Sequence, residues 1–442
     1  MAERSRTRTR YGGVRGRARS LRAALAVVLL GAGLAACGDD GGPPELTWYV
    51  NPDNGGQMKI AQRCSQASGG RYTITTSLLP SDATAQREQL IRRLAAKDSG
   101  IDLMSLDPVF VPEAANAGFL RPFTPSEAAP LTQGVFPVAV QSSTWKGKLY
   151  AAPMWANTQI LWYRKSVARR AGINPNDPNF TWDQLIDAAT RTNTLVGVQG
   201  NRYEGYVVWI NALIASAGGR MIGQTERGSR ASIEIDSPAG REAARIIGKL
   251  ARSGVASPTL STDIEEQSRA TINSPRGGFL LNWGYVWQAE KGDAEDGAIS
   301  PNIVNDLGWA PYPKVTPNQP ARPPFGGIEI GVSAFSRHQD VAVEAVRCIT
   351  SPANMKQYML DEGNVAARPD IFDDPDILQQ FPMAPLLRDS IVASSPRPNT
   401  PYYADLSGAV QNRWHPPTEV NESTPGETSV FVRQVLRDQA LL

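Results

Sequence analysis

Short apolar runs alternate with segments of helical periodicity at the start of the folded part of the chain. The runs at 46–50, 72–78 and 101–107 have the length of buried strands. Between them, residues 58–67 and 84–96 place apolar side chains on one stripe, which predicts two helices. The order strand, helix, strand, helix, strand is typical of a parallel sheet covered by helices.

Two acidic residues follow predicted strands. Asp53 lies in the polar turn after the first strand, and Asp107 closes the third. In open sheets of this kind, ligands bind outside the carboxyl ends of the strands. We therefore expect Asp53 and Asp107 to lie near a ligand site.

The remaining pattern continues as helices and short strands. Residues 147–163 predict a strand that leaves a first lobe and enters a second. Thr181 is a predicted helix N-cap, and Gln184 completes its capping box. Further elements are helices at 204–217 and 238–252, a strand at 277–283, two strands that return to the first lobe at 308–313 and 326–332, and a mostly helical tail.

The length of the chain predicts more than one core. About 405 residues follow residue 36, too many for one hydrophobic core, and 41% of the chain is hydrophobic. The predicted fold class is α/β, with two lobes that each contain a mainly parallel sheet flanked by helices, joined by three crossings. The first lobe is assigned to 46–153 plus 308–360 and the second to 154–307 plus 361–442.

The first 36 residues have the pattern of a signal peptide. Eight arginines precede an apolar run at 23–36, which is shorter than the roughly 20 residues of a membrane-spanning helix. Leu34, Ala35, Ala36 and Cys37 resemble the bacterial lipobox, which implies cleavage before Cys37 and a lipid on that residue. Residues 37–45 then form a flexible tether. Ordinary secretion with an incidental cysteine is the alternative.

Removing the leader changes the charge of the chain. Eight basic residues and one acid are lost, which leaves 37 basic and 42 acidic residues. A slight acidic excess without a basic cluster argues against nucleic acid as a partner.

Besides Cys37, the chain has two cysteines, Cys64 and Cys348. Outside the cytosol they form either a disulfide or two buried thiols.

Enzyme and metal motifs are missing from the sequence. The two histidines, His338 and His415, are far apart, and there is no HExxH, no G-x-S-x-G and no cysteine cluster. We therefore expect no catalytic residues, no metal and no cofactor. A glycoside-processing enzyme with paired carboxylates is the weaker alternative.

Several motifs together resemble a known family. They are Gln86-Arg87, Lys148 to Pro153, Asn157-Thr158-Gln159, Leu161-Trp162-Tyr163, Glu204-Gly205, Ser216 to Gly219, Gly326-Gly327 and Arg397-Pro398. The chain is similar to the extracellular solute-binding lipoproteins of ABC importers for oligosaccharides, and within them to the trehalose-binding lipoproteins of mycobacteria. This resemblance implies the two-lobe type II periplasmic-binding-protein fold. Cys64 and Cys348 have counterparts there, which favours the disulfide.

The resemblance also implies a sugar site. The counterparts of the sugar-binding residues are Asp53, Asn54, Gln86, Asp107, Asn157, Glu265, Trp283, Gly327 and Arg397. Asn54 stands where the relative has glycine, and the segment between Trp283 and Trp309 is shorter than in the relative. Carboxylates, amides and a guanidinium would pair with hydroxyls, and the indole would cover a sugar face.

Each of these residues also has an ordinary structural explanation. Asp53 is a turn former, Asp107 could cap a helix, and Glu265 lies in an acidic run typical of a solvated helix start. Trp283 could belong to a core. The spacing alone therefore does not separate site from scaffold, whereas the resemblance favours the site.

The resemblance implies the partners and the location as well. The expected ligand is a disaccharide, with trehalose first and a maltose-type oligosaccharide as the alternative. The expected partners are the transmembrane permease subunits of an ABC importer and their cytoplasmic ATPase. We expect a monomer held by the lipid on Cys37 at the extracytoplasmic face of the bacterial cell membrane.

Overall fold

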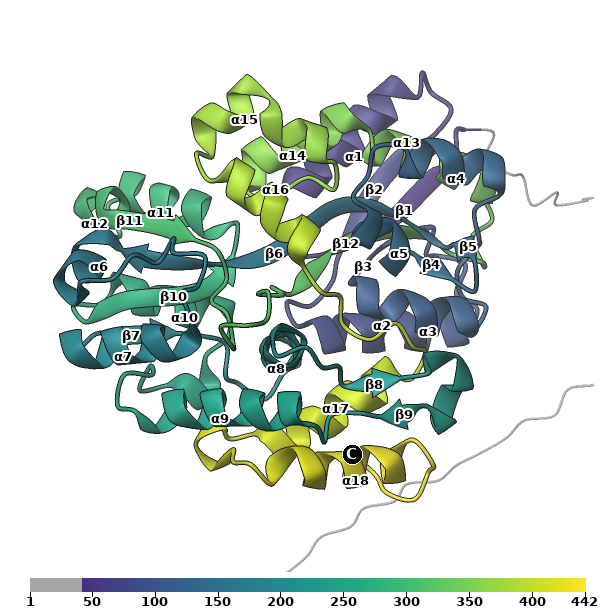
Figure 1. Ribbon diagram of the computed structural model, residues 1–442. Coiled ribbons are helices and arrows are strands. Elements are labelled where there is room, and N and C mark those ends of the chain that lie inside the picture. Colours follow the sequence, from purple (N-terminus) through teal and green to yellow (C-terminus); the bar gives the residue numbers. More distant parts are fainter. Residues whose placement is uncertain (1–41) are drawn as a thin grey trace, which may run out of the picture. The chain divides into compact units, whose positions relative to one another are not determined.

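The computed structural model describes residues 42–442 (Figure 1). The predictions made for the leader at 1–36, for Cys37 and for most of the tether fall outside the described residues. Within 42–442 the chain forms a mixed α/β structure with helices on both faces of its main sheet.

Residues 42–442 contain twelve strands. They are β1 Glu45–Val50, β2 Thr73–Leu78, β3 Leu103–Leu106, β4 Thr144–Trp145, β5 Lys148–Leu149, β6 Ala151–Arg164, β7 Leu195–Gly197, β8 Ile222–Gly223, β9 Ser232–Ile233, β10 Gly277–Trp283, β11 Leu307–Ala310 and β12 Phe325–Val332.

The same residues contain eighteen α-helices. The first nine are α1 Gly56–Ala67, α2 Ala83–Ala95, α3 Val111–Asn116, α4 Pro125–Thr132, α5 Pro137–Ser142, α6 Lys165–Ala171, α7 Trp182–Thr192, α8 Glu204–Ser216 and α9 Pro238–Arg252. The others are α10 Glu265–Asn273, α11 Val286–Glu295, α12 Pro301–Asp306, α13 Gln339–Ile349, α14 Pro352–Glu362, α15 Pro375–Gln380, α16 Ala384–Ala393, α17 Tyr403–Trp414 and α18 Thr424–Val435.

The main sheet has eight strands in the order β2-β1-β3-β12-β6-β10-β7, and β11 also pairs with β6. Strands β1, β2 and β3 are parallel, which confirms the prediction for the start of the chain. The later strands change the pattern, because β12 is antiparallel to both β3 and β6, and β10 is antiparallel to β6. The sheet is therefore mixed where we predicted mainly parallel sheets.

Strand β6 joins the two halves of this sheet. Its first half, Ala151 to Thr158, pairs with β12, and its second half, from Gln159, pairs with β10. The strand predicted at 147–163 is thus present as β6 from Ala151 onward, whereas Lys148–Leu149 form the separate strand β5, which pairs with β4. The lobe boundaries themselves stay a prediction.

Strand β11 pairs with the second half of β6. The sequence analysis assigned 308–313 to the first lobe, and the structure pairs β11 with Leu161–Arg164 at the far end of β6. The strands that pair with β6 differ along its length. β12 occupies the first half, and β11 and β10 occupy the second.

Local signals account for several helix starts. Thr181 and Gln184 form the predicted capping box of α7, since each side chain bonds the backbone N–H of the other residue. α9 begins after the Ser237 cap with proline at its first position, and its bounds agree with the prediction. α8 differs from α7 and α9 in its burial, because all but one of its thirteen residues are buried.

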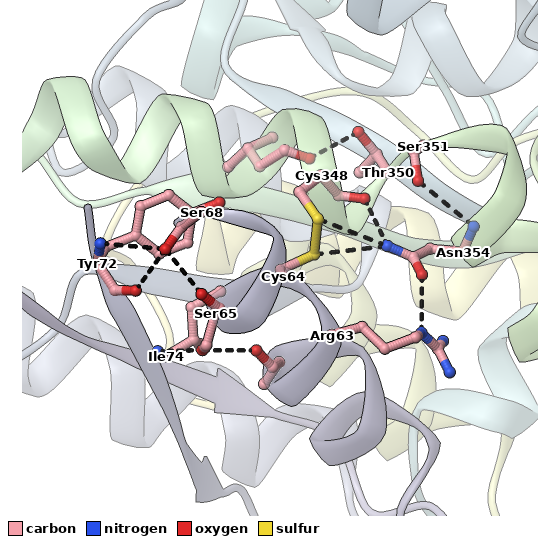
Figure 2. The surroundings of a disulfide bond; sticks show 12 residues. Arg63, Cys64, Ser65, Ser68, Tyr72, Ile74, Cys348, Thr350, Ser351 and Asn354 are labelled. Atoms are coloured by element: carbon pink, nitrogen blue, oxygen red, sulfur yellow. Dashed lines mark hydrogen bonds between the residues drawn. A yellow bond between two sulfur atoms is a disulfide. The ribbon is translucent and has the colours of Figure 1, made fainter. Parts of the chain in front are cut away.

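A disulfide between Cys64 and Cys348 ties α1 to α13, as the resemblance implied. Figure 2 shows the amide of Asn354, at the start of α14, lying across both sulfur atoms. The same amide group donates to the Cys348 carbonyl oxygen at 2.7 Å, and its oxygen accepts from Arg63 at 3.0 Å. The disulfide thus belongs to a three-helix cluster of α1, α13 and α14.

Candidate functional site

A cavity of about 650 Å³ lies where three helices begin, α2, α8 and α10. Strands β3 and β10 end at it, and β12 starts there. Six of the nine predicted site residues line it, from segments that are distant in the sequence. They are Asp107, Asn157, Glu265, Trp283, Gly327 and Arg397.

The other three predicted residues do not line this cavity. Asp53 accepts hydrogen bonds from the backbone N–H groups of Gly55 and Gln57 and from the Tyr358 hydroxyl. It therefore fixes the start of α1, the structural role that the turn sequence alone favoured. Asn54 is exposed, and its backbone N–H donates to Glu362 at 2.9 Å.

Gln86 lies on the buried face of α2. It is buried, accepts from the Asn51 side chain at 2.7 Å and donates to the Pro80 carbonyl oxygen at 2.7 Å. Gln86 thus closes the polar loops that precede α1 and α2. The geometry assigns it to the support of the cavity rather than to its wall.

Arg397 forms the charged centre of the site. Its side chain is almost fully buried, with one amino group 2.6 Å from Asp107 and the other 2.6 Å from Glu204. Burial by itself would lower the pKa of Arg397, but the neighbouring Asp107, Tyr403 and Glu204 raise it. The guanidinium therefore stays charged and holds two carboxylates in place.

Glu204 is a site residue whose role the sequence analysis missed. Its carboxylate accepts from Arg397, from the Tyr403 hydroxyl and from the Ser407 hydroxyl. Burial raises the pKa of the Glu204 carboxyl, and Arg397 offsets part of this rise. The available signal was one acid at the start of the otherwise apolar α8, because a buried charge needs a partner.

Glu265 faces the cavity with two aromatic neighbours. It begins α10, and Tyr203 and Trp283 line the cavity beside it. Burial raises the pKa of the Glu265 carboxyl. Glu265 is partly buried and lines the cavity, so the alternative of a solvated helix start describes its exposed neighbour Glu266 better than Glu265 itself.

Two glycines let backbone and ring surfaces approach the cavity. Gly327 has φ of 145°, and a Cβ there would lie 2.2 Å from the Trp155 carbonyl oxygen, so only glycine fits. A Cβ at Gly326 would meet the Trp283 ring at 3.1 Å. Trp155 also lines the cavity, and it stacks on Tyr358 with ring centres 4.9 Å apart.

Three polar atoms of cavity-lining residues are buried without a hydrogen-bond partner in residues 42–442. They are Asn157 Oδ1, Tyr203 Oη and Arg397 Nε. Buried polar atoms are normally paired, so such atoms mark places where a ligand group can pair. Together with Asp107, Glu265 and the indole rings they suit a polar, uncharged ligand with many hydroxyls.

The cavity also contains lining residues outside the predicted set. They are Ser81, Asp82, Ala83, Thr84, Trp155, Asn201, Arg202, Tyr203, Glu204, Gly205, Val208, Ile264, Gly326 and Gln411. Most of them belong to helix starts and their preceding loops. Within residues 42–442, no group of three or more His, Cys, Asp or Glu side chains is arranged to hold a metal ion.

Comparison with known proteins identifies relatives of this chain. The family model of bacterial extracellular solute-binding proteins matches residues 67–356. A probable ABC transporter-binding protein of Deinococcus radiodurans is 27% identical over 339 residues, which are 74% of this chain and 77% of that protein.

Solved structures share the fold. The maltose-bound MalE3 of T. maritima superimposes with a TM-score of 0.77 at 22% identity, over 90% of this chain and all of that chain. The GacH receptor of Streptomyces glaucescens gives 0.73 at 19% identity, over 90% and 100% of the two chains. The predicted fold class, a type II periplasmic sugar-binding fold, is confirmed.

None of the helices in 42–442 is both long and apolar enough to cross a bilayer.

Proposed function

Because the chain belongs to the family of bacterial extracellular solute-binding proteins, we propose that it captures trehalose and delivers it to an ABC importer. It is a sugar-binding protein of the ABC-transporter type and not an enzyme. The alternative of a glycoside-processing enzyme is therefore dropped.

The polar lining of the 650 Å³ cavity is the observation that carries this proposal. Its size lies within the range of roughly 300–1,000 Å³ that is usual for small-molecule sites. Asp107, Glu265 and the unpaired Oδ1 of Asn157 accept hydroxyl protons, and the unpaired Nε of Arg397 donates to a sugar oxygen. Trp283 and Trp155 offer flat surfaces for the C–H faces of the two rings. The backbone at Gly327 can approach the sugar because no side chain intervenes.

Asp53, Asn54 and Gln86 have a supporting role in this proposal. Asp53 holds the Tyr358 hydroxyl at 3.2 Å, and Tyr358 stacks on the cavity residue Trp155. Asn54 holds Glu362 beside the same turn. Asp53 thereby keeps the Trp155 surface in place, and Gln86 supports the loops before α1 and α2, so these residues act on the sugar indirectly.

We extend the proposal to the membrane and the importer. Cleavage before Cys37 and lipid attachment to that residue would hold the receptor at the outer face of the cell membrane. The receptor, a monomer, would then present the sugar to the transmembrane permease subunits, which are driven by a cytoplasmic ATPase. The lipobox resemblance of Leu34 to Cys37 supports this step.

Titration calorimetry of the protein with trehalose tests the proposed ligand. We expect saturable binding, and Glu265→Gln should weaken it at least tenfold because the amide accepts fewer hydroxyl protons. Glu226→Gln changes an exposed acid outside the cavity and is the matched control. Absence of heat with trehalose, under conditions where the protein is folded, would refute the proposal.

A maltose-type oligosaccharide is the second candidate. It is favoured by the fold shared with MalE3 of T. maritima, which was solved with maltose. The same titration with maltose separates the two candidates. Strong binding of maltose together with no binding of trehalose would assign the site to maltose-type sugars.

A further inference from the structure

Five exposed basic side chains gather at the end of the second half of the sheet that lies away from the cavity. Three of them lie on α6, one near the end of α7 and one directly before β10. β10 ends at the cavity, and a strand of its length separates its two ends by roughly 20 Å. We call these residues the α6 basic patch: Lys165, Arg169, Arg170, Arg191 and Arg276.

Hydrogen bonds to the backbone bring the three segments of the patch together. Arg191 donates to the carbonyl oxygen of Ala171, at the end of α6, at 3.3 Å. Arg276 donates to the side chain of Asn193, the C-cap of α7, at 2.9 Å. Figure 1 shows α6 and α7 at the same end of the sheet. The charges thus come from separate segments, which is why the sequence alone showed no basic cluster.

Acidic side chains leave most of this charge uncompensated. Within residues 42–442 no member of the patch forms an ion pair, and the nearby acids are bound elsewhere. Asp306 pairs with Arg164 at 2.9 Å, and Asp187 pairs with Lys249 at 3.0 Å. α6 itself contains no acid, and Asp177, in the loop after α6, can offset at most one charge. The patch is therefore a local positive surface on a chain that is slightly acidic without its leader.

We propose that the α6 basic patch binds the anionic phospholipid headgroups of the cell membrane, so that the second half of the sheet faces the bilayer. This proposal rests on the proposed location of the receptor at the outer face of that membrane. The lipid on Cys37 would hold the receptor there, whereas the patch would determine which face it turns toward the headgroups.

The composition of the patch suits phosphate groups. Four of its five residues are arginines, and a guanidinium can bind a phosphate through two parallel hydrogen bonds. Each basic residue close to an anionic membrane strengthens binding about fivefold. The attraction falls off within a Debye length, so added salt weakens it.

Co-sedimentation with vesicles tests the proposal. The protein is the processed chain, residues 37–442, with Cys37→Ala so that no lipid is attached. The leader is absent, so its eight arginines cannot contribute. Vesicles of phosphatidylcholine are compared with vesicles of equal parts phosphatidylcholine and phosphatidylglycerol. We expect at least tenfold stronger binding to the anionic vesicles, and loss of this difference at about 0.5 M salt. Equal binding to both kinds of vesicle would overturn the proposal.

The decisive variant is Arg169→Glu with Arg170→Glu. It reverses two charges of the patch and should weaken binding to anionic vesicles at least tenfold. The matched control is Arg337→Glu with Arg347→Glu, which changes the net charge equally at exposed positions before and within α13. The control should lose less than threefold. Equal losses in the two double variants would mean that net charge alone governs binding, and the patch would be rejected.

A milder variant covers the case in which Arg169→Glu with Arg170→Glu does not fold. Lys165→Gln with Arg169→Gln removes two charges without adding acids and should weaken binding to anionic vesicles at least fivefold. Wild-type binding in this folded variant would also overturn the proposal.

Two further measurements separate this proposal from the proposed function. All of these variants should bind trehalose as the wild type does, because none of the substituted residues lines the cavity. Absence of trehalose binding in the wild type would refute the proposed ligand and leave the vesicle result unaffected. Mass spectrometry of Cys37 in the protein isolated from membranes tests the lipid anchor independently of the patch.

Discussion

Arg397 lies 2.6 Å from Asp107, Nη2 to Oδ1, although 290 residues separate them in the sequence. Asp107 follows β3, whereas Arg397 lies in the loop between α16 and α17. Through its other amino group Arg397 also holds Glu204, at the start of α8. The wall of the cavity therefore depends on one buried unit of three charges from three distant segments.

This unit makes Arg397 both a binding and a stabilising residue. Arg397→Ala would leave the buried Glu204 and the partly buried Asp107 without their cation, and breaking a buried pair costs about 3–5 kcal/mol of unfolding free energy. Arg397→Lys keeps the charge but loses the two-pronged geometry of the guanidinium. We expect Arg397→Lys to bind trehalose at least tenfold more weakly and to lose less stability than Arg397→Ala. Calorimetry and urea unfolding measure the two effects.

The control for the two Arg397 variants is Arg347→Lys, on the exposed face of α13. It should leave both affinity and stability unchanged. Wild-type affinity in Arg397→Lys would show that the guanidinium does not contact the sugar.

Glu329 predicts a pH dependence of stability. It is 1% exposed on β12, accepts from the Ser142 hydroxyl at 2.6 Å, and burial raises its pKa to about 8. Between the unfolded pKa near 4.5 and this value, the folded protein holds a proton that the unfolded chain has released. The contribution of Glu329 is therefore fully present below the unfolded pKa and is lost as the pH rises toward 8.

Glu329→Gln removes this dependence, since the amide mimics the protonated acid. Urea unfolding at pH 5 and pH 8 should show similar stabilities at pH 5 and a more stable variant at pH 8. Because each pH unit between pH 5 and pH 8 is worth about 1.4 kcal/mol, the difference between the two proteins should change by at most about 4 kcal/mol over this interval. Nearby Asp107 adds to the rise and Ser143 reduces it, and both remain in the variant. A stability difference that is the same at both pH values would contradict the protonated state.

Much of the fold was predictable because local signals and tertiary structure agree. The apolar runs of β1 and β10 and the caps of α7 and α9 each specify their element within a few residues. Pairing was harder to predict. A run such as β11 shows that it is a strand but not which part of β6 it joins, since that depends on the neighbours already in place.

The residues of the candidate site also fall into those that the sequence could identify and those that it could not. Family resemblance selected Asp107, Glu265 and Arg397, all of which line the cavity. Glu204 was missed because its importance depends on Arg397, which lies 193 residues away. Asp53 shows the opposite case, because its turn sequence correctly predicted a local capping role that the resemblance set aside.

Gly327→Ala should affect stability and binding together. The left-handed φ and the 2.2 Å approach to the Trp155 carbonyl oxygen force the backbone of β12 to move. We expect a loss of about 2 kcal/mol or more of unfolding free energy and weaker trehalose binding. Gly292→Ala, in α11 with open space around it, should instead be neutral or stabilising. Thermal melting with and without trehalose measures both variants.

The disulfide should stabilise the fold without contributing to the site. Cys64 and Cys348 are 284 residues apart, and closing so long a loop is worth about 5 kcal/mol in the chain-entropy model. The double variant Cys64→Ser with Cys348→Ser should therefore unfold at a lower urea concentration. Neither cysteine lines the cavity, so trehalose affinity of the folded variant should stay within twofold of the wild type.

The matched control is Asn354→Ala, which keeps the disulfide but removes the amide that lies across it. It should lower the unfolding free energy by only about 1–3 kcal/mol. A large loss of affinity in the double variant would instead mean that the site depends on the disulfide. In that case the bond would hold α1, α1 would hold the turn at Asp53, and this turn would position Trp155.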